Sequence, residues 1–220
     1  WPFVEFTTDA KMRADEIFKQ FVANVRGNSI YEHIDWTGFS EEEQEKWLQK
    51  YRLIYEASSH LFMSNASAIN LDKLKHCTDG LGVLPDSPAL LNARVEVEKL
   101  LYTDSVRVIE SGNPDKALDL AGEILKIYPQ SATAWIIRAN ARQNKGDMQR
   151  ALTAAQRAVN IAPNNPETRF NLGFILFRIG QFDRAIAEYK EMLRVAEQTG
   201  EIGNFRRAQM LDAFAAVYAA

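Results

Sequence analysis

Small and rigid residues recur every 34 positions in the C-terminal half of this 220-residue chain. Glycine, alanine and proline follow one another at fixed offsets: Gly112, Ala117 and Pro129, then Gly146, Ala151 and Pro163, then Gly180 and Ala185, with Glu197 in the proline position. A fixed period of this length predicts a stack of equivalent units. We place them at residues 98–131, 132–165 and 166–199, without insertions.

Each 34-residue unit is predicted to be a pair of helices. Apolar residues between 169 and 189 recur at three- and four-residue spacings, as they do along one face of a helix. The glycine at unit position 15 is expected to end the first helix with a positive φ, which a side chain with a Cβ resists. Alanine at position 20 faces another small residue at position 8, so the two helices can approach closely. That small residue is Ser105, Ala139 or Gly173 in turn.

This pattern resembles the tetratricopeptide repeat family, and residues 98–199 carry the resemblance. The second unit has Trp135, Ala139, Gly146, Ala151, Ala158 and Pro163 in the family's positions, and the third has Leu172, Gly173, Gly180, Phe182, Ala185 and Tyr189. The resemblance implies an all-α fold of three stacked repeats followed by a capping helix. This sequence departs from the family at position 7, which holds Asp104 and Arg138, and at position 4 of the third repeat, Arg169. We predict a partly buried ion pair between Asp104 and Arg138, shared with Arg142.

The segments on either side of the repeats are also predicted to be helical. Residues 1–87 form a separate N-terminal region, with one helix from after Thr8 to Gly27 and a second that begins with a capping box of Ser40 and Glu43. Residues 64–87, with Gly80, Gly82 and Pro85, are interpreted as a loop or linker. A long helix is then expected from Pro88 to about 111, so that the repeat domain covers 88–220. A C-terminal capping helix is expected at about 204–218.

The family resemblance implies a concave groove lined by the first helix of each repeat. Its family positions are 2, 5, 9, 12 and 13, and several of them are aromatic or aliphatic here, which is typical of a binding surface. The residues expected to contact a partner are Tyr102, Val106, Ile109, Ile136, Asn140, Phe170, Asn171, Phe174, Phe177 and Arg178. The occupant is either a peptide or helix of another protein or the chain's own N-terminal helices. Asn140 and Asn171 match a clamp for the acidic tails of chaperones, but Ile136 replaces the lysine that such a clamp needs.

Other kinds of site find little support in the sequence. The histidines are His33, His60 and His76, and the adjacent pair His76-Cys77 is interpreted as part of a solvated loop rather than a zinc site. No phosphate-binding loop or catalytic motif is present. We therefore expect no cofactor, no metal and no catalytic residue. A net charge of −3 argues against a general nucleic-acid binder. No apolar run is long enough to span a bilayer.

The sequence thus predicts a non-enzymatic protein-interaction module: an adaptor, an assembly factor or a chaperone-like subunit. Two alternatives stay open, an accessory or regulatory part of an enzyme and a scaffold that associates with itself as a homo-oligomer. Because the chain begins with Trp1 and not with methionine, we expect it to be part of a longer protein. The cytoplasm is slightly favoured as its compartment, while a periplasmic or membrane-anchored protein is also compatible with the sequence.

Overall fold

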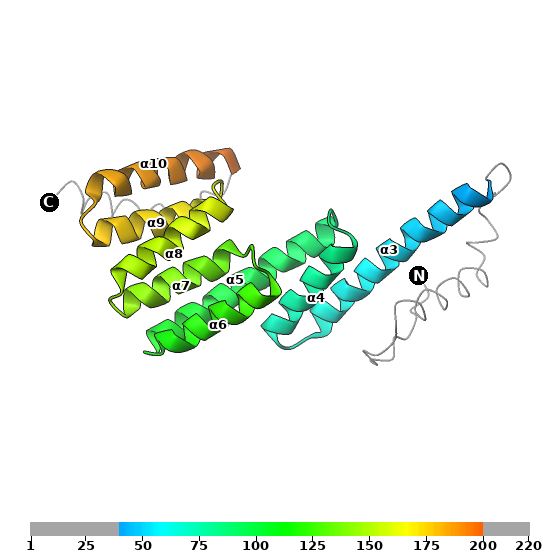
Figure 1. The fold of residues 1–220 in the computed structure, drawn as a ribbon, viewed down its shortest axis with the longest axis horizontal. Helices are drawn as coiled ribbons and strands as arrows, with labels where there is room; N and C mark the ends of the chain where they lie inside the picture. The colour runs from blue at the N-terminus through cyan, green and yellow to red at the C-terminus, as the bar shows by residue number, and fades with distance from the viewer. Residues whose placement is uncertain (1–39, 200–220) are drawn as a thin grey trace. The chain divides into compact units, whose positions relative to one another are not determined.

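A computed structural model describes residues 40–199, and this part of the chain is helical throughout apart from short turns. Its helices are α3 (Glu41–Ala66), α4 (Asn70–Val83), α5 (Pro88–Glu110), α6 (Pro114–Ile127), α7 (Ala132–Asn144), α8 (Met148–Ile161), α9 (Pro166–Arg178) and α10 (Phe182–Thr199). The predicted all-α fold is therefore confirmed (Figure 1). The helices predicted near 9–27 and 204–218 lie outside the described residues.

The described residues divide into two compact units, of which the first contains 40–68 and 76–94. Helix α3 begins with the predicted capping box. The Ser40 backbone N–H donates to Glu43 Oε2 at 2.8 Å, and the Glu43 backbone N–H donates to Ser40 Oγ at 3.3 Å. Because the first bond favours the ionised carboxylate, it lowers the pKa of Glu43. The helix continues to Ala66.

The loop or linker predicted at 64–87 is wrong, because Asn70–Val83 is the helix α4. Gly80 lies inside this helix and is buried. A Cβ built on it would stand 2.8 Å from the His60 Cβ and 2.9 Å from the Leu90 Cδ1. This glycine therefore serves close packing between helices, and not a turn. The pair His76-Cys77 likewise lies in α4, where Cys77 is fully buried with its Sγ 3.1 Å from Ser64 Oγ.

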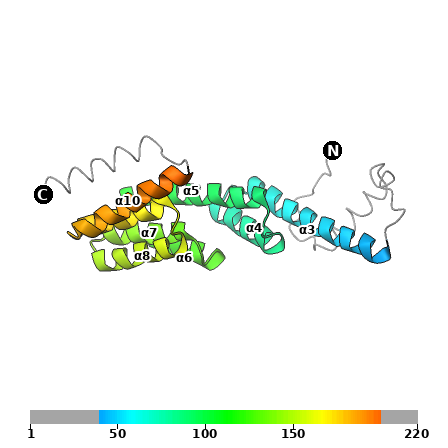
Figure 2. The ribbon, with the colours of Figure 1, turned by 90° about the horizontal axis from the view of Figure 1, so that it is seen from above.

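The second unit contains residues 69–75 and 95–199, and it carries the repeats. The second helices of the three repeats begin at Pro114, Met148 and Phe182, each 34 residues after the last. The first helices of repeats two and three, at Ala132 and Pro166, keep the same interval. Helices α7, α8, α9 and α10 pack in chain order, each against the next, as Figures 1 and 2 show from two directions. The predicted stack of helix pairs is confirmed.

The repeating glycines end the first helices as predicted. Gly112, Gly146 and Gly180 have φ values of 81°, 79° and 77°. In the second repeat the Gly146 N–H donates to the Gln143 carbonyl and the Asp147 N–H donates to the Arg142 carbonyl, both at 2.9 Å. These two bonds form a Schellman motif, which satisfies carbonyls that the helix end leaves unpaired.

The contact within each helix pair also follows the 34-residue pattern. Ala117, Ala151 and Ala185 are all fully buried, and they belong to apolar cores together with residues of the first helices. The third repeat differs from the second in how this contact is filled. A Cβ on Gly173 would stand 2.7 Å from Cε1 of Tyr189, so the missing side chain on α9 makes room for a large ring on α10.

The ion pair predicted between Asp104 and Arg138 does not form. Asp104 instead accepts a hydrogen bond from Asn70 Nδ2 at 2.8 Å and pairs with Arg107 at 3.2 Å. The Arg138 guanidinium lies over the Trp135 ring, 4.9 Å from its centroid, and Arg142 pairs with Asp147 at 3.6 Å. Each charge thus has a partner on its own helix or in a nearby segment, which avoids the cost of burying a pair between helices.

Candidate protein-binding face

The residues predicted to contact a partner lie on the first helices of the repeats. We call this set of positions 2, 5, 9, 12 and 13 on α5, α7 and α9 the first-helix face. Helices α7 and α9 are in contact, and α5 and α7 share one apolar core through Leu101, Ala134 and Ile137. The three parts of the face thus belong to one compact unit.

The third repeat supplies an aromatic part of the first-helix face. Phe170, Phe174 and Phe177 are all half-buried. The Phe170 and Phe174 rings stack with centroids 6.4 Å apart, and the Phe177 ring lies 5.6 Å from that of Phe182, a residue that is 39% exposed. Phe170 and Phe177 also pack against the apolar core beneath them, whereas Phe174 is not among the residues packed there. Phe174 is therefore the ring with the smallest structural role.

The Tyr189 ring supports this aromatic part from below. It is fully buried, and its centroid lies 6.0 Å from that of Phe170. Burial raises the pKa of Tyr189 to about 12, because a phenolate would have to form away from water. A continuous aromatic contact therefore runs from the core of the third repeat through Phe170 to Phe174 at its surface.

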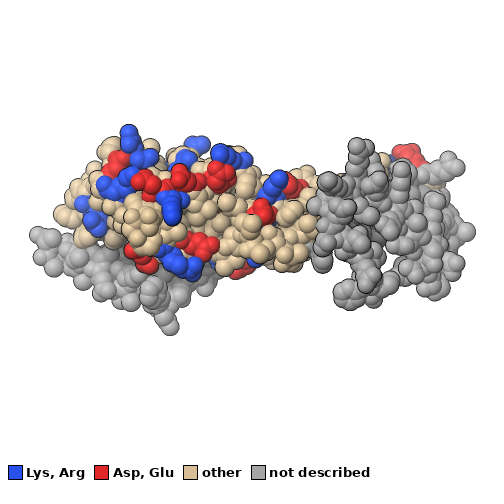
Figure 3. Space-filling model, turned by 90° about the horizontal axis from the view of Figure 1, so that it is seen from below, with Lys and Arg blue, Asp and Glu red and all other residues tan. Residues whose placement is uncertain are grey.

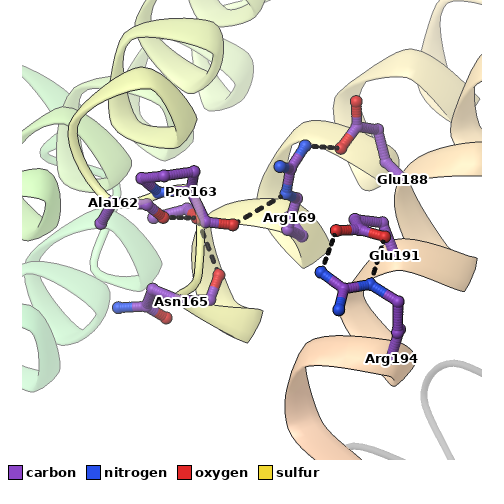
Figure 4. Close-up of polar contacts among 8 residues, drawn as sticks. Ala162, Pro163, Asn165, Arg169, Glu188, Glu191 and Arg194 are labelled. Atoms are coloured by element: carbon purple, nitrogen blue, oxygen red, sulfur yellow. Dashed lines mark hydrogen bonds and ion pairs between the residues drawn. The ribbon is translucent and has the colours of Figure 1, made fainter. Parts of the chain in front are cut away.

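Arg169 links α9 to the preceding turn and to α10 (Figure 4). Its Nε donates to the Pro163 carbonyl at 3.1 Å, and its Nη1 lies 2.9 Å from Glu188 Oε2. Both side chains of this ion pair are largely buried, with 19% and 23% exposed. Because Arg169 precedes Phe170 and Glu188 precedes Tyr189, two successive contacts hold the register of α9 against α10. From the sequence, Arg169 was recognised only as a departure from the family pattern. The sequence contains no signal that Glu188 would be its ion-pair partner.

A second ion pair lies next to the first on α10. Arg194 donates to both carboxylate oxygens of Glu191, at 2.9 Å and 2.6 Å, as Figure 4 shows. The hydrogen bond from Arg194, reinforced by its charge, lowers the pKa of Glu191. In the first turn of α9, the Thr168 hydroxyl lies 2.9 Å from the Ala162 carbonyl and 2.8 Å from that of Asn165. The two Thr168 hydrogen bonds tie the start of the third repeat to the turn that precedes it.

The first repeat supplies an aliphatic part of the first-helix face. Tyr102, Val106 and Ile109 are half-buried on α5, and Tyr102 and Ile109 pack against the core of that repeat. Lys99 on the same helix pairs with Glu96 at 2.7 Å. Apolar surface is therefore present at both ends of the row of first helices.

The middle of the first-helix face is polar. Ile136, in the middle of the face, is only 2% exposed, and Asn171, at position 6 on α9, is only 6% exposed, so these two predicted contact residues serve mainly the packing of the repeats. Asn171 Nδ2 donates to the Glu167 carbonyl of its own helix at 3.3 Å. Asn140 and Gln143 are half-buried and Asn144 is exposed. Within residues 40–199 the side-chain amides of these three residues form no hydrogen bond, so they are available to a ligand.

The surface of the described residues carries both signs of charge. On the face shown in Figure 3, Lys and Arg are interspersed with Asp and Glu, and neither sign dominates. Across residues 40–199 no group of three or more His, Cys, Asp or Glu side chains is placed to hold a metal ion. None of the helices within that range combines the length and the apolar character needed to cross a bilayer.

Paired helices repeated at a constant interval, with a glycine-terminated turn inside each pair, define a helical repeat protein. Family models described as tetratricopeptide repeat match residues 108–166 and 144–208 of this chain. Residues 108–208 thus match the tetratricopeptide repeat family. The family resemblance stated from the sequence is confirmed.

Similar proteins have been found by sequence and by structure. Tetratricopeptide repeat protein 36 of Mus musculus is 36% identical over 70 residues, which cover 32% of this chain and 38% of that protein. The translocator chaperone SycD of Yersinia enterocolitica superposes with a TM-score of 0.48 at 13% identity, over 56% of this chain and 93% of its own. PcrH of Pseudomonas aeruginosa, in complex with the chaperone-binding region of PopD, superposes with a TM-score of 0.44 at 18% identity. The match covers 55% of this chain and 88% of PcrH.

Proposed function

We propose that the first-helix face binds an apolar segment of a partner protein, and that the chain acts without catalysis as an adaptor, assembly factor or chaperone-like subunit. Its tetratricopeptide repeats make it a protein-interaction module. The finer role rests on the side chains that this particular chain places on the face.

The observation that carries the proposal is the aromatic part of the third repeat. Three phenylalanines occupy face positions 5, 9 and 12 of one helix, and none of them is fully buried. Rings held in place by a packed support lose little conformational entropy on binding, and such rings dominate the energy of many interfaces. Phe174 has this support through Phe170 and Tyr189. It is therefore the expected anchor for the apolar segment.

A photo-crosslinking experiment tests the proposal in the full-length protein in its native cells. Phe174 is replaced by benzoylphenylalanine, which preserves an aromatic ring, and the crosslinked products are identified by mass spectrometry. Leu100, which is 47% exposed on a different face of α5, serves as the matched control position. We expect position 174 to capture one or a few partner proteins that position 100 does not capture.

Three other results would contradict this proposal, and each has a distinct meaning. Equal products at positions 174 and 100 would show that the first-helix face has no special role. A crosslink from 174 to residues of the same chain would show that the chain fills its own face. A crosslink to a second copy would favour the self-associating scaffold.

A further inference from the structure

The last residues of the three first helices form a row with a defined order of charge. They are Glu110 on α5, Asn144 on α7 and Arg178 on α9, and all three occupy position 13 of their repeats. Each is exposed. The row therefore runs from a negative charge in the first repeat, through a neutral amide, to a positive charge in the third.

Neither charge of this row is used within the described residues. Among residues 40–199, Glu110 and Arg178 take part in no ion pair or side-chain hydrogen bond. A cation at a helix C-terminus is stabilising, so Arg178 has a structural reason for its place. The same interaction disfavours a carboxylate, so helix stability does not explain Glu110 as the last residue of α5. An opposite charge on a ligand would explain it.

The middle of the first-helix face suits an extended peptide backbone. Asn140, Gln143 and Asn144 present amides that form no hydrogen bond in this part of the chain, and an amide can both donate and accept. A helix has already paired its own backbone groups, whereas an extended segment needs partners for them. The polar middle therefore favours an extended ligand, with apolar side chains directed to the first and third repeats.

The distance between Glu110 and Arg178 sets how many ligand residues separate the two groups that contact them. Packed helices have axes about 8–10 Å apart, so α5 and α9, with α7 between them, are separated by roughly 20 Å. An extended chain covers about 3.3 Å per residue, so a ligand crosses this distance in about six residues. A helical ligand would need about 13 residues for the same distance.

We propose that the first-helix face selects an extended peptide with a basic residue and an acidic residue about six positions apart and apolar residues between them. The basic residue pairs with Glu110 and the acidic residue with Arg178, which fixes the direction of the peptide. This inference rests on the proposed function, and it adds to it the chemistry and the orientation of the partner segment.

The experiment begins with a random 16-residue peptide library displayed on phage and selected on the intact chain. Synthetic versions of the enriched peptides are compared with counterparts in which the two charged residues are exchanged. Binding is measured to the wild-type protein and to the double variant Glu110→Arg/Arg178→Glu. Asp119→Arg/Arg157→Glu is the control, because both of these residues are exposed charges on second helices.

We expect enriched peptides to carry opposite charges five to seven residues apart. Exchanging the charges should weaken binding to the wild type by about tenfold, since rim charges affect orientation more than affinity. The Glu110→Arg/Arg178→Glu variant should prefer the exchanged peptides, and the control variant should behave as the wild type. Peptides that bind both proteins equally, or whose charges are about 13 residues apart, would overturn the inference.

Phe174→Ala separates this inference from the proposed function. If Phe174→Ala abolishes binding but the charge exchange has no effect, the face binds apolar segments and the charge row has no role. If no enriched peptide depends on Phe174, the proposed function and the inference both fail. A dimer in sedimentation that Phe174→Ala dissociates would mean that a second copy occupies the face, which would also overturn the inference.

Discussion

Repeats two and three have the same backbone arrangement, but different side chains pack inside their helix pairs. Their turn glycines have φ values of 79° and 77°, and their helices begin 34 residues apart. Where the second repeat places Ala139 against a helix carrying Ala155, the third places Gly173 against Tyr189. The third repeat therefore has a smaller side chain on its first helix and a larger one on its second helix. The difference shows that the backbone arrangement is constant, while the side chains at each contact change in complementary pairs.

Position 4 shows a second difference of the same kind. The second repeat has Trp135 there, half-buried and covered by the Arg138 guanidinium. The third repeat has Arg169, which holds a carbonyl of the preceding turn and a carboxylate of the following helix. One repeat is held at this position by an aromatic ring, and the other by a charge-assisted network.

The largest expected effect comes from removing the Tyr189 ring. Tyr189→Ala should destabilise the protein by about 3–5 kcal/mol, because it leaves a cavity that α9 cannot fill. Gly173→Ala alone should cost about 1–3 kcal/mol through overpacking against that ring. In the Tyr189→Ala background the same Gly173→Ala change recreates the pair of the second repeat and should be neutral or stabilising. Urea unfolding of the four proteins measures this coupling, and simple additivity would disprove the complementary pairing.

Alkaline pH should weaken the third repeat and not the second. Tyr189 has a pKa of about 12 in the folded protein, against 10.0 for the free side chain. Below pH 10 its contribution is constant. Between pH 10 and 12 the unfolded chain loses the phenol proton while the folded chain keeps it, so the free energy of unfolding falls by about 1.4 kcal/mol per pH unit.

Tyr189→Phe isolates this effect. Its unfolding free energy, measured by urea titration from pH 9 to 11.5, should fall less steeply than that of the wild type. The second repeat has Ala155 at this position and offers no such group. Parallel pH profiles for the two proteins would contradict the assignment of the slope to Tyr189.

Breaking the Arg169 network should cost less than removing the ring. Arg169→Ala leaves Glu188 without its partner in a site that is 23% exposed, and we expect a loss of about 1–3 kcal/mol. Arg138→Ala, the matched change in the second repeat, removes a stacking contact and should cost about 1 kcal/mol or less. Thermal unfolding of both variants and of the Arg169→Ala/Glu188→Ala double variant provides the measurement. Equal losses of stability in Arg169→Ala and Arg138→Ala would show that the two repeats are not held differently at position 4.

The most uniform effect is expected at the shared turn. Gly146→Ala and Gly180→Ala should each cost about 1–2 kcal/mol, because alanine resists a φ near 80°. Gly122→Ala is the control, since a Cβ built on Gly122 in α6 meets nothing within 4 Å. That change should stabilise the protein by about 0.5–1 kcal/mol. Clearly different losses of stability at Gly146 and Gly180 would mean that the two repeats do not share the same turn geometry.

The candidate site was only partly predictable. The resemblance to tetratricopeptide repeats located the first-helix face and its phenylalanines, and the 34-residue period carried the face positions from one repeat to the next. It did not distinguish rings that pack on the core, such as Phe170, from Phe174. It also included Ile136 and Asn171, which the packing of neighbouring repeats buries. Whether these residues contact a partner stays a prediction.

By itself the sequence determined the features that depend on local backbone geometry. A glycine that must adopt a positive φ, a capping box and a constant helix interval are encoded within a few residues of where they act. The tertiary structure decided what depends on contacts between distant residues. Gly80 suggested a turn but lies in a helix against His60 and Leu90, and Asp104 pairs with Asn70 and Arg107 instead of Arg138. A small residue permits both a turn and close packing, and a charge accepts any nearby partner, so only the folded neighbours select between these outcomes.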